Sequence, residues 1–421
     1  MKEKDRMRNL ERDDPLVASL VRREGSRVEA TLDLIAAENH PPPSIMEAQG
    51  SIFTIKTIEG YPGRRYHSGC LYADEIEELA VARAKELFGA EHVNVQPHSG
   101  TSANLAVYFS VLEVGDRVLA ISLPHGGHLS HGHRASITSR CFSFSHYTTD
   151  RETGLIDYEE VRRIAEKEKP RMIVAGASSY PRLIDYRRMA DIARDVSAFL
   201  CADMAHIAGL VAAKVIPSPV PHCDFVTFSC YKTMMGGRGG VILCRKRHGR
   251  RIDSAVFPGT QGTAPVSSLA AKAVMFRLAG TRAFAEVQKR TVEDAAALAD
   301  RLRQRGYGIV SGGTDNHQIL VDLSPKGISG KEAEDMLESV GILANRNVIP
   351  RDADSPGTVS GLRLGTPAPA ARGMGPEEMR TAAALMDRTL RSKGAGPVLE
   401  QVAAEVKALT GRFPAYPPQD R

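Results

Sequence analysis

The sequence has few aromatic residues and no long apolar run. Its 421 residues include no tryptophan, and aromatic residues make up only 5% of the chain. No run reaches about 18 apolar residues, the length that a membrane-spanning helix requires. The densely charged segment 1–14 also lacks the apolar stretch of a signal peptide. We therefore expect neither a membrane span nor a signal peptide.

The sequence is also poor in cysteine. Its six cysteines show no C-x-x-C spacing of the kind that indicates a metal or redox motif. Several lie in apolar, strand-like runs, where a free thiol behaves as a small hydrophobic group. Unpaired thiols are typical of a reducing compartment, so we expect a cytoplasmic location. The six are Cys70, Cys141, Cys201, Cys223, Cys230 and Cys244.

Neither sign of charge dominates the chain. The 55 lysines and arginines are nearly balanced by 50 acidic residues, which leaves a net charge of +5. Because the two signs are intermixed, we expect no surface for nucleic acid. A hydrophobic fraction of 42% and a charged fraction of 25% are typical of a globular protein. The length favours two domains.

Apolar strand-like runs alternate with helical patterns through the middle of the chain. This alternation predicts an α/β fold with a mostly parallel sheet flanked by helices. Beyond position 280 a long helix is followed by strands such as 319–323, which predicts a smaller C-terminal α/β domain. We expect an N-terminal arm over 1–30, a large domain over 31–280, a small domain over 281–421, and an extended strap at 413–418. The strands expected in the large domain are 93–95, 118–122, 172–175, 198–201, 225–228 and 241–244.

A single lysine, Lys232, lies between two apolar runs. The run 226–231 carries it into a glycine-rich turn, and the run 241–244 follows. Desolvation at such a strand end lowers the pKa of an ammonium group and frees its lone pair for attack on a carbonyl. A Schiff-base lysine requires this property. The alternative is a solvated lysine beside a glycine turn.

An aspartate, Asp203, ends the apolar run 199–202, about thirty residues before Lys232. This order of strand-end aspartate and strand-end lysine suits pyridoxal phosphate. The carboxylate can pair with the pyridinium nitrogen while the lysine holds the aldehyde. The alternative is an aspartate that caps the next helix. Together, the two residues favour the cofactor interpretation.

The string Ser99-Gly100-Thr101 stands between an expected strand and an expected helix. Backbone N–H groups at a helix start, together with two hydroxyls, form a natural phosphate site. An ordinary helix N-cap is the alternative.

Three histidines, His125, His128 and His131, surround a pair of glycines. Their even spacing raises metal binding as an alternative to a cofactor contact. Gly126 and Gly127 argue against a helix that would align the rings, so we expect no metal site.

Arg363 lies in a short apolar strand run. A buried arginine is costly unless it is paired, and its bidentate fork suits the carboxylate of an amino acid. A structural ion pair is the alternative.

Several longer strings resemble those of the serine hydroxymethyltransferase family. The resemblance runs from about Leu34 to about Met386, in the family's order. It implies a pyridoxal-phosphate enzyme with an aspartate aminotransferase-like large domain built on a seven-stranded sheet. The family reaction interconverts serine and glycine with tetrahydrofolate as the one-carbon carrier. The strings are 59–66 (EGYPGRRY), 96–104 (QPHSGTSAN), 124–131 (PHGGHLSH), 203–206 (DMAH), 311–317 (SGGTDNH) and 360–367 (SGLRLGTP).

The resemblance also implies roles for individual residues. In the family, the glutamate at the position of Glu59 reaches the neighbouring subunit's site, which implies a homodimer or a tetramer of two dimers. The implied catalytic residues are Lys232, Glu59, His128 and Tyr66. The implied cofactor contacts are Ser99, Gly100, Thr101, His128, Ser178, Asp203, His206, Ser229, Lys232 and Gly262. The implied substrate contacts are Arg363, Ala37, Tyr66, His67 and Tyr231, and the implied folate contacts are Leu123, Gly127, Leu129 and Asn347.

The chain departs from the family pattern at five places where the family contacts substrate or phosphate. These departures keep a second activity open, namely a 2-methylserine hydroxymethyltransferase or a threonine-type aldolase or transaldolase. A catalytically inactive binding protein is disfavoured because Lys232, Asp203, Glu59 and Arg363 are intact. The departures are Ala37 for serine, Thr57 and His67 for two tyrosines, Tyr231 for histidine, and GTQGT at 259–263 for GGQGG.

Overall fold

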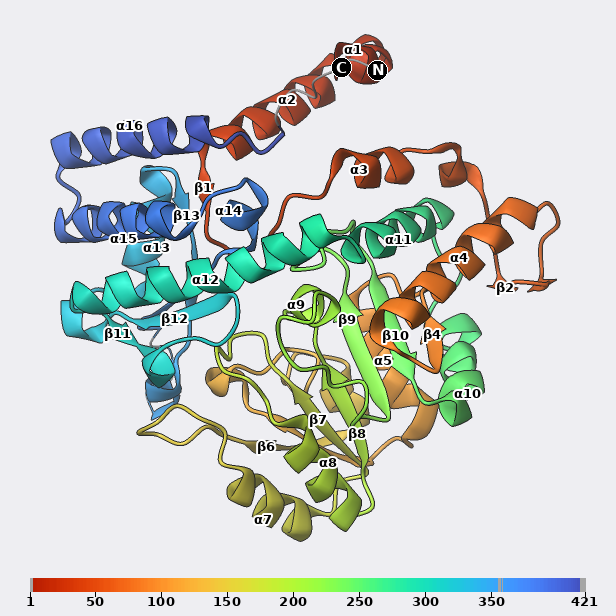
Figure 1. Ribbon diagram of the computed structural model, residues 1–421. Coiled ribbons are helices and arrows are strands. Elements are labelled where there is room, and N and C mark those ends of the chain that lie inside the picture. Colours follow the sequence, from red (N-terminus) through yellow and green to blue (C-terminus); the bar gives the residue numbers. More distant parts are fainter. Residues whose placement is uncertain (1–2, 355–356, 358, 417–421) are drawn as a thin grey trace.

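The centre of the molecule is a seven-stranded sheet (Figure 1). The computed structural model describes residues 3–354, 357 and 359–416. Strand β10 runs antiparallel to both of its neighbours, and the other pairs are parallel. This sheet confirms the predicted fold class. In spatial order the strands are β4 (His92–Asn94), β10 (Gly240–Cys244), β9 (Phe225–Ser229), β8 (Phe199–Asp203), β7 (Met172–Gly176), β5 (Arg117–Ile121) and β6 (Ser143–Tyr147).

Helices cover both faces of this sheet because successive side chains of a strand point to opposite faces. Leu119 and Ile173 belong to one buried cluster, and their neighbours Val118 and Val174 belong to another. The first face is covered by α4 (Leu71–Phe88), α7 (Tyr158–Glu168), α8 (Tyr186–Asp195), α9 (Ala208–Ala212) and α11 (Val266–Ala279). The second face is covered by α5 (Gly100–Val111) and α10 (Gly249–Ser254).

A second, smaller core is built around a four-stranded antiparallel sheet, as predicted for the C-terminal part. Its strands, in spatial order, are β11 (Gly308–Ile309), β12 (Gln318–Asp322), β15 (Gly361–Gly365) and β14 (Asn345–Asn347). Its helices are α12 (Arg282–Gln304), α13 (Gly330–Ser339), α14 (Pro367–Ala371), α15 (Pro376–Arg391) and α16 (Gly396–Arg412).

The chain enters the smaller core before it enters the larger one. Strand β1 (Leu32–Asp33) pairs in parallel with β13 (Ile342–Leu343), and Leu32 and Leu34 are buried in the second cluster. Residues 32–34 therefore pack outside the large domain that we expected to begin at residue 31. The domain limits themselves stay a prediction.

Two N-terminal helices, α1 (Glu3–Asp13) and α2 (Pro15–Ala30), extend away from the body (Figure 1). The buried Arg372 guanidinium fixes the end of α2, because it donates to carbonyls of α2 and to those of Thr410 and Phe413 at the end of α16. The expected strap is described as far as Tyr416, whose amide donates to Glu29. Its last two residues, 417 and 418, lie outside the described residues.

The remaining elements connect these layers. They are α3 (Pro43–Gln49), α6 (Thr138–Cys141), the hairpin strands β2 (Gly60–Tyr61) and β3 (Arg64–Arg65), and helical turns including η1 (Ile52–Ile55), η2 (Leu123–His125), η4 (Ala255–Thr260) and η7 (Pro350–Asp354). The cysteines are unpaired, and all but the half-buried Cys141 are buried. Among the described helices, none combines the length and the apolar character needed to cross a bilayer.

Candidate active site

One pocket lies at the carboxyl ends of β7, β8 and β9, where open α/β sheets place their ligands. Every cofactor contact expected from the sequence lines this pocket except Gly262. The lining residues are Ser99, Gly100, Thr101, Asn104, His128, Ala177, Ser178, Asp203, Ala205, His206, Ser229, Tyr231 and Lys232.

Lys232 is buried in this pocket, three residues after β9. Burial lowers the pKa of its ammonium group to about 8, against the opposing effect of Asp203. The positive charges of Arg363 and Arg238 lower this pKa further. The lysine therefore has the partly neutral amine that attack on an aldehyde requires.

Asp203 ends β8 as an ionised carboxylate. Its Oδ2 accepts from Asn104 Nδ2 at 2.8 Å and from His131 Nε2 at 3.0 Å. Burial alone would raise the pKa of this carboxyl, but the hydrogen bond and charge of His131 hold it well below its ordinary value. The site thus keeps a negative charge where a pyridinium nitrogen requires one.

Four residues that support Asp203, namely Asn104, His131, Tyr108 and Thr227, were not predicted as site residues. Tyr108 OH lies 2.6 Å from His131 Nδ1, and Thr227 Oγ1 donates to Asn104 Oδ1 at 2.6 Å. Tyr108 and Asn104 are on α5, so this helix fixes both hydrogen-bond partners of the Oδ2 atom. His131 and Asn104 lie inside two of the strings that resemble the family, and this position was the sequence feature that pointed to them.

The N-terminus of α5 forms one end of the pocket. Ser99 caps the helix by accepting from Ser102 N, and Gly100 and Thr101 begin it. The loop 97–99 lies against β10, because a Cβ on Gly240 would meet Ser99 O at 2.1 Å. The buried Ser229 Oγ has no hydrogen-bond partner among the described residues. This hydroxyl beside free helix N–H groups is a cradle for a phosphate.

His128 lines the pocket next to Asp203. Its Nδ1 lies 2.7 Å from Ser130 Oγ, and burial lowers its pKa to about 4. The ring is therefore a neutral imidazole at neutral pH, suited to stacking on an aromatic cofactor. Together with His131 and Asp203 it also offers three potential metal ligands within 4.8 Å of one another. The expected absence of a metal stays a prediction.

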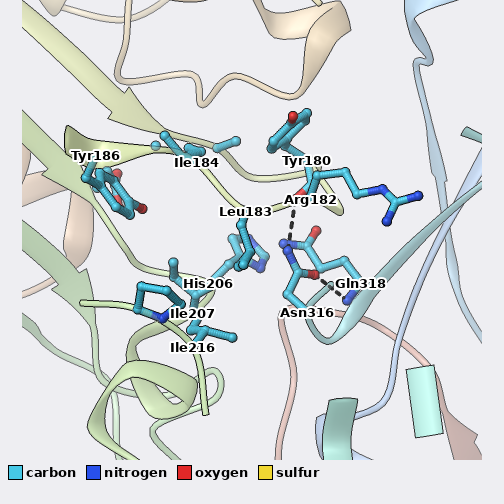
Figure 2. Close-up of a pocket in the computed structure, with 14 residues that line it drawn as sticks. Tyr180, Arg182, Leu183, Ile184, Tyr186, His206, Ile207, Ile216, Asn316 and Gln318 are labelled. Atoms are coloured by element: carbon cyan, nitrogen blue, oxygen red, sulfur yellow. Dashed lines mark hydrogen bonds between the residues drawn. The ribbon is translucent and has the colours of Figure 1, made fainter. Parts of the chain in front are cut away.

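His206 stacks on His317, which immediately precedes β12 of the smaller sheet. The His206 and His317 rings are 5.6 Å apart at an interplanar angle of 15°, and Nδ1 of His206 lies 3.4 Å from Nε2 of His317. Figure 2 shows a second cavity, which is lined mainly by apolar side chains and shares Ala177, Asp203 and His206 with the pocket. Asn316 closes it by donating to Tyr180 O at 3.2 Å, so the start of β12 is tied to the loop after β7.

Arg363, on β15, lies beside the pocket and contacts Ser178, one of its lining residues. Its Nη1 donates to Ser178 O at 2.9 Å and its Nε to Asn345 Oδ1 at 3.1 Å. Burial lowers its pKa to about 10, so the guanidinium stays charged at neutral pH. Within the described residues no carboxylate pairs with it, which argues against the ion-pair alternative. Ala37 lies nearby, because a Cβ on Gly365 would meet the Cα of its neighbour Ala36 at 2.4 Å.

Four further predicted residues, Glu59, Tyr66, His67 and Gly262, also do not line this pocket. Tyr66 is 77% exposed, His67 and Gly262 are exposed, and Glu59 is half-buried. The Glu59 and Gly262 loops meet, because Thr263 Oγ1 donates to Ile58 O at 2.5 Å. Thr263 is one of the departures from the family pattern, and its hydroxyl adds this contact.

The four folate candidates are arranged around the β5 end. Leu123 and Leu129 are 39% and 52% exposed, on either side of the turn that bears His128. Gly127 leaves no room for a side chain, because a Cβ there would meet Ile121 O at 2.4 Å. Asn347 Nδ2 donates to Ser179 Oγ at 3.3 Å, which brings β14 to the same region.

The fold and the pocket define a pyridoxal-phosphate enzyme of the aspartate aminotransferase-like class. The residues fit this cofactor, since the orphaned Ser229 Oγ and the α5 N-terminus suit its phosphate and Asp203 suits its ring nitrogen. The family model described as serine hydroxymethyltransferase matches residues 10–386, and the chain belongs to that family.

The lowered pKa of Lys232 predicts the pH dependence of cofactor capture. The neutral amine is the reactive form, so the capture rate of the cofactor-free protein should rise with pH and level off above about pH 8. The control is Nα-acetyl-lysine amide in solution, whose free side-chain amine has the ordinary pKa near 10.4. Stopped-flow absorbance measures both rates. A protein rate that follows the control up to pH 10 would contradict the assignment.

Proposed function

We propose that the protein transfers a hydroxymethyl group between a β-hydroxy amino acid and tetrahydrofolate, with serine and glycine as the reference pair. One observation carries the proposal: Lys232 and Asp203 line one pocket, and Arg363, which has no carboxylate partner among the described residues, donates to the carbonyl of Ser178 in the lining of that pocket. These three supply a covalent anchor, a counter-charge for the ring and a site for the amino-acid carboxylate.

When bound, pyridoxal phosphate would serve as an electron sink for the bond broken at the substrate Cα. The Asp203 carboxylate holds a proton on the ring nitrogen, and its hydrogen bonds from Asn104 and His131 prevent it from turning away. Arg363 orients the substrate carboxylate, and this orientation selects the Cα bond to be cleaved. The buried, neutral His128 would cover one ring face and exclude water from it.

We propose that Glu59, Tyr66 and Gly262 complete the partner's site in a homodimer. Glu59 has no hydrogen-bond donor at its carboxylate among the described residues. Large apolar side chains in the segment 46–72 that contains Glu59 are exposed, which is typical of a protein interface. They are Met46, Ile52, Ile55, Tyr66, Leu71 and Tyr72. A tetramer of two such dimers stays a prediction, as does the cytoplasmic location.

Subunit mixing tests this arrangement. Lys232→Ala and Glu59→Gln subunits should each be inactive, and their mixture should recover about a quarter of the wild-type activity, since half of the random dimers hold one intact site. Sedimentation should show dimers throughout. Absence of recovery in a mixture with dimeric mass would refute a shared site.

Tetrahydrofolate is the proposed one-carbon carrier because the faces of a flat ring system could pack on the exposed Leu123 and Leu129 beside His128. The amide of Asn347 adds a polar contact on the side of β14.

Among the residues that differ from the family pattern, Tyr231 faces the substrate most directly. It lines the pocket, and its ring lies 4.0 Å from the Arg238 guanidinium carbon. A phenol in place of the family's histidine, with the serine hydroxyl lost at Ala37, changes both the shape and the polarity of the pocket. We therefore keep 2-methylserine, or a bulkier β-hydroxy amino acid, as the alternative substrate.

Comparison of kcat/KM for serine, 2-methylserine and threonine, with and without tetrahydrofolate, tests the function. A methyl-sized change in a pocket is worth about 1–3 kcal/mol, so Tyr231→His should shift the serine preference by roughly 10- to 200-fold. The control is Tyr158→His, which disrupts a similar stack with Arg188 at 4.5 Å outside the pocket. No turnover of any of these amino acids would refute the proposed function.

A further inference from the structure

The long helix α12 connects the two cores of the molecule. Phe284, in its first turn, is buried in the first cluster, and Ala295 and Leu298 are buried in the second. Figure 1 shows the helix running along both parts. Between these ends, one stripe at helical spacing buries three polar residues, Gln288, Thr291 and Asp294, and the first two of them bind loops of the site.

Gln288 binds the loop that carries the cofactor lysine. Its Nε2 donates to the carbonyl of Thr233, the residue after Lys232, at 2.9 Å. Thr233 is fully buried, and its Oγ1 donates to His206 O at 2.8 Å and accepts from Gly209 N at 3.0 Å. The lysine loop, the loop after Asp203 and α12 are therefore joined at one threonine.

Thr291 binds the strand that carries the substrate arginine. Its carbonyl accepts from Thr366 Oγ1 at 2.6 Å, and Thr366 follows β15 three residues after Arg363. Thr366 is also fully buried, and its amide donates to His317 O at 3.2 Å. The two attachment points on α12 are three residues apart, on the same face of the helix.

We propose that this face of α12 is a frame that sets the position of Lys232 relative to Arg363, with Gln288 and Thr366 as positioning residues. The inference rests on the proposed function, in which Lys232 carries the cofactor and Arg363 binds the substrate carboxylate. A bond in the substrate is broken only when it is aligned with the cofactor, and misplacement by about 1 Å costs roughly 10²-fold. Hydrogen bonds from one rigid helix to both halves fix this alignment.

Four variants of the cofactor-loaded enzyme test the frame. Gln288→Met keeps length and loses the donor, and Thr366→Val keeps shape and loses the hydroxyl. Thr366→Ser keeps the hydroxyl and should restore wild-type behaviour. Thr389→Val is the control, because Thr389 is equally buried but donates within its own helix, to Leu385 O at 2.9 Å.

The readouts are the glycine Kd, the cofactor Kd of the cofactor-free protein, and the pH midpoint of the bound cofactor's absorbance. Thr366→Val should raise the glycine Kd roughly ten- to hundredfold and leave the cofactor Kd unchanged. Gln288→Met should raise the glycine Kd to a similar extent. It should also shift the pH midpoint, because Gln288 binds the loop that carries Lys232. Thr389→Val should lower only the melting temperature.

The frame is refuted if Gln288→Met and Thr366→Val lower the melting temperature as the control does and leave the glycine Kd within twofold of wild type. A wild-type enzyme whose absorbance responds to no amino acid would instead refute the proposed function. In that case the pH midpoint of Gln288→Met still decides whether α12 positions Lys232, and an unchanged midpoint overturns the frame.

Discussion

Replacement of Arg363 with alanine should raise the KM for the amino acid by roughly 10²- to 10³-fold, with the cofactor still bound. Its guanidinium is largely buried, and its two protein partners, Ser178 O and Asn345 Oδ1, are neutral acceptors. The charge is therefore available to an anionic ligand. Truncating one partner of a desolvated, hydrogen-bonded charge pair costs about 2–5 kcal/mol.

Titration of the cofactor absorbance with glycine measures this effect without turnover. Arg363→Lys keeps the charge and loses the bidentate fork, so it should fall between wild type and Arg363→Ala. The control is Arg388→Ala, which removes an arginine paired with Glu405 at 2.8 Å in the same part of the molecule. Glycine binding by Arg363→Ala within threefold of wild type would exclude a carboxylate contact.

The core of the candidate site could be predicted because its charged residues interrupt apolar strands. Lys232 and Asp203 are single ionisable residues at strand ends, and burial at such a position must be compensated by chemistry or by partners. The structure brings both into one pocket. Arg363 is likewise a single charged residue in an apolar strand, β15. It lacks a carboxylate partner among the described residues.

Residues that act through other residues could not be found in this way. Tyr108 looks like an ordinary apolar-face residue of α5, and its contact with His131 exists only because α5 lies across the sheet. Gln288 and Thr233 are 55 positions apart, and their hydrogen bond depends on how the two cores pack. No local pattern encodes such a pairing.

Two features of the fold were missed for similar reasons. Strand β6 (Ser143–Tyr147) is at the sheet edge, where polar and apolar residues alternate and no continuous apolar run marks it. Strand β1 is only two residues long, and its partner β13 lies about 310 positions away. Short pairings of this kind are determined by packing, and here that packing places Leu32 in the smaller core.

Replacement of Asp203 with asparagine should lower kcat by about 10²- to 10³-fold, the usual cost of removing one preorganised electrostatic group from a buried site. The asparagine cannot supply the negative charge that holds a proton on the ring nitrogen. In addition, its NH₂ group would replace an oxygen to which Asn104, His131 or Ala205 now donates. The cofactor should stay attached, because Lys232 is unchanged.

The pH dependence distinguishes this role from a general effect on folding. The pKa of Asp203 is held well below its ordinary value. The carboxylate is therefore ionised at every pH above about 4, the ordinary value, and the stability it contributes is lost only as the pH falls through the lowered pKa. The loss of kcat in Asp203→Asn should accordingly be the same at pH 6.5 and at pH 9, within the roughly neutral range where maximal stability is usual. A loss of kcat at only one of these pH values would contradict the role of Asp203 as the partner of the ring nitrogen.

A matched control lies where α10 packs on the edge strand β4 of the same sheet. Asp253 accepts from His92 Nε2 and from Asn94 Nδ2, both at 2.9 Å, which repeats the partners of Asp203 away from the pocket. Asp253→Asn should lower the melting temperature and leave kcat within threefold of wild type. If Asp203→Asn behaved in the same way, the carboxylate would serve packing alone, and the ring nitrogen would need another partner. If only Asp203→Asn loses turnover, the same Asp–His–Asn arrangement is structural beside the edge strand β4 and catalytic at the end of the central strand β8.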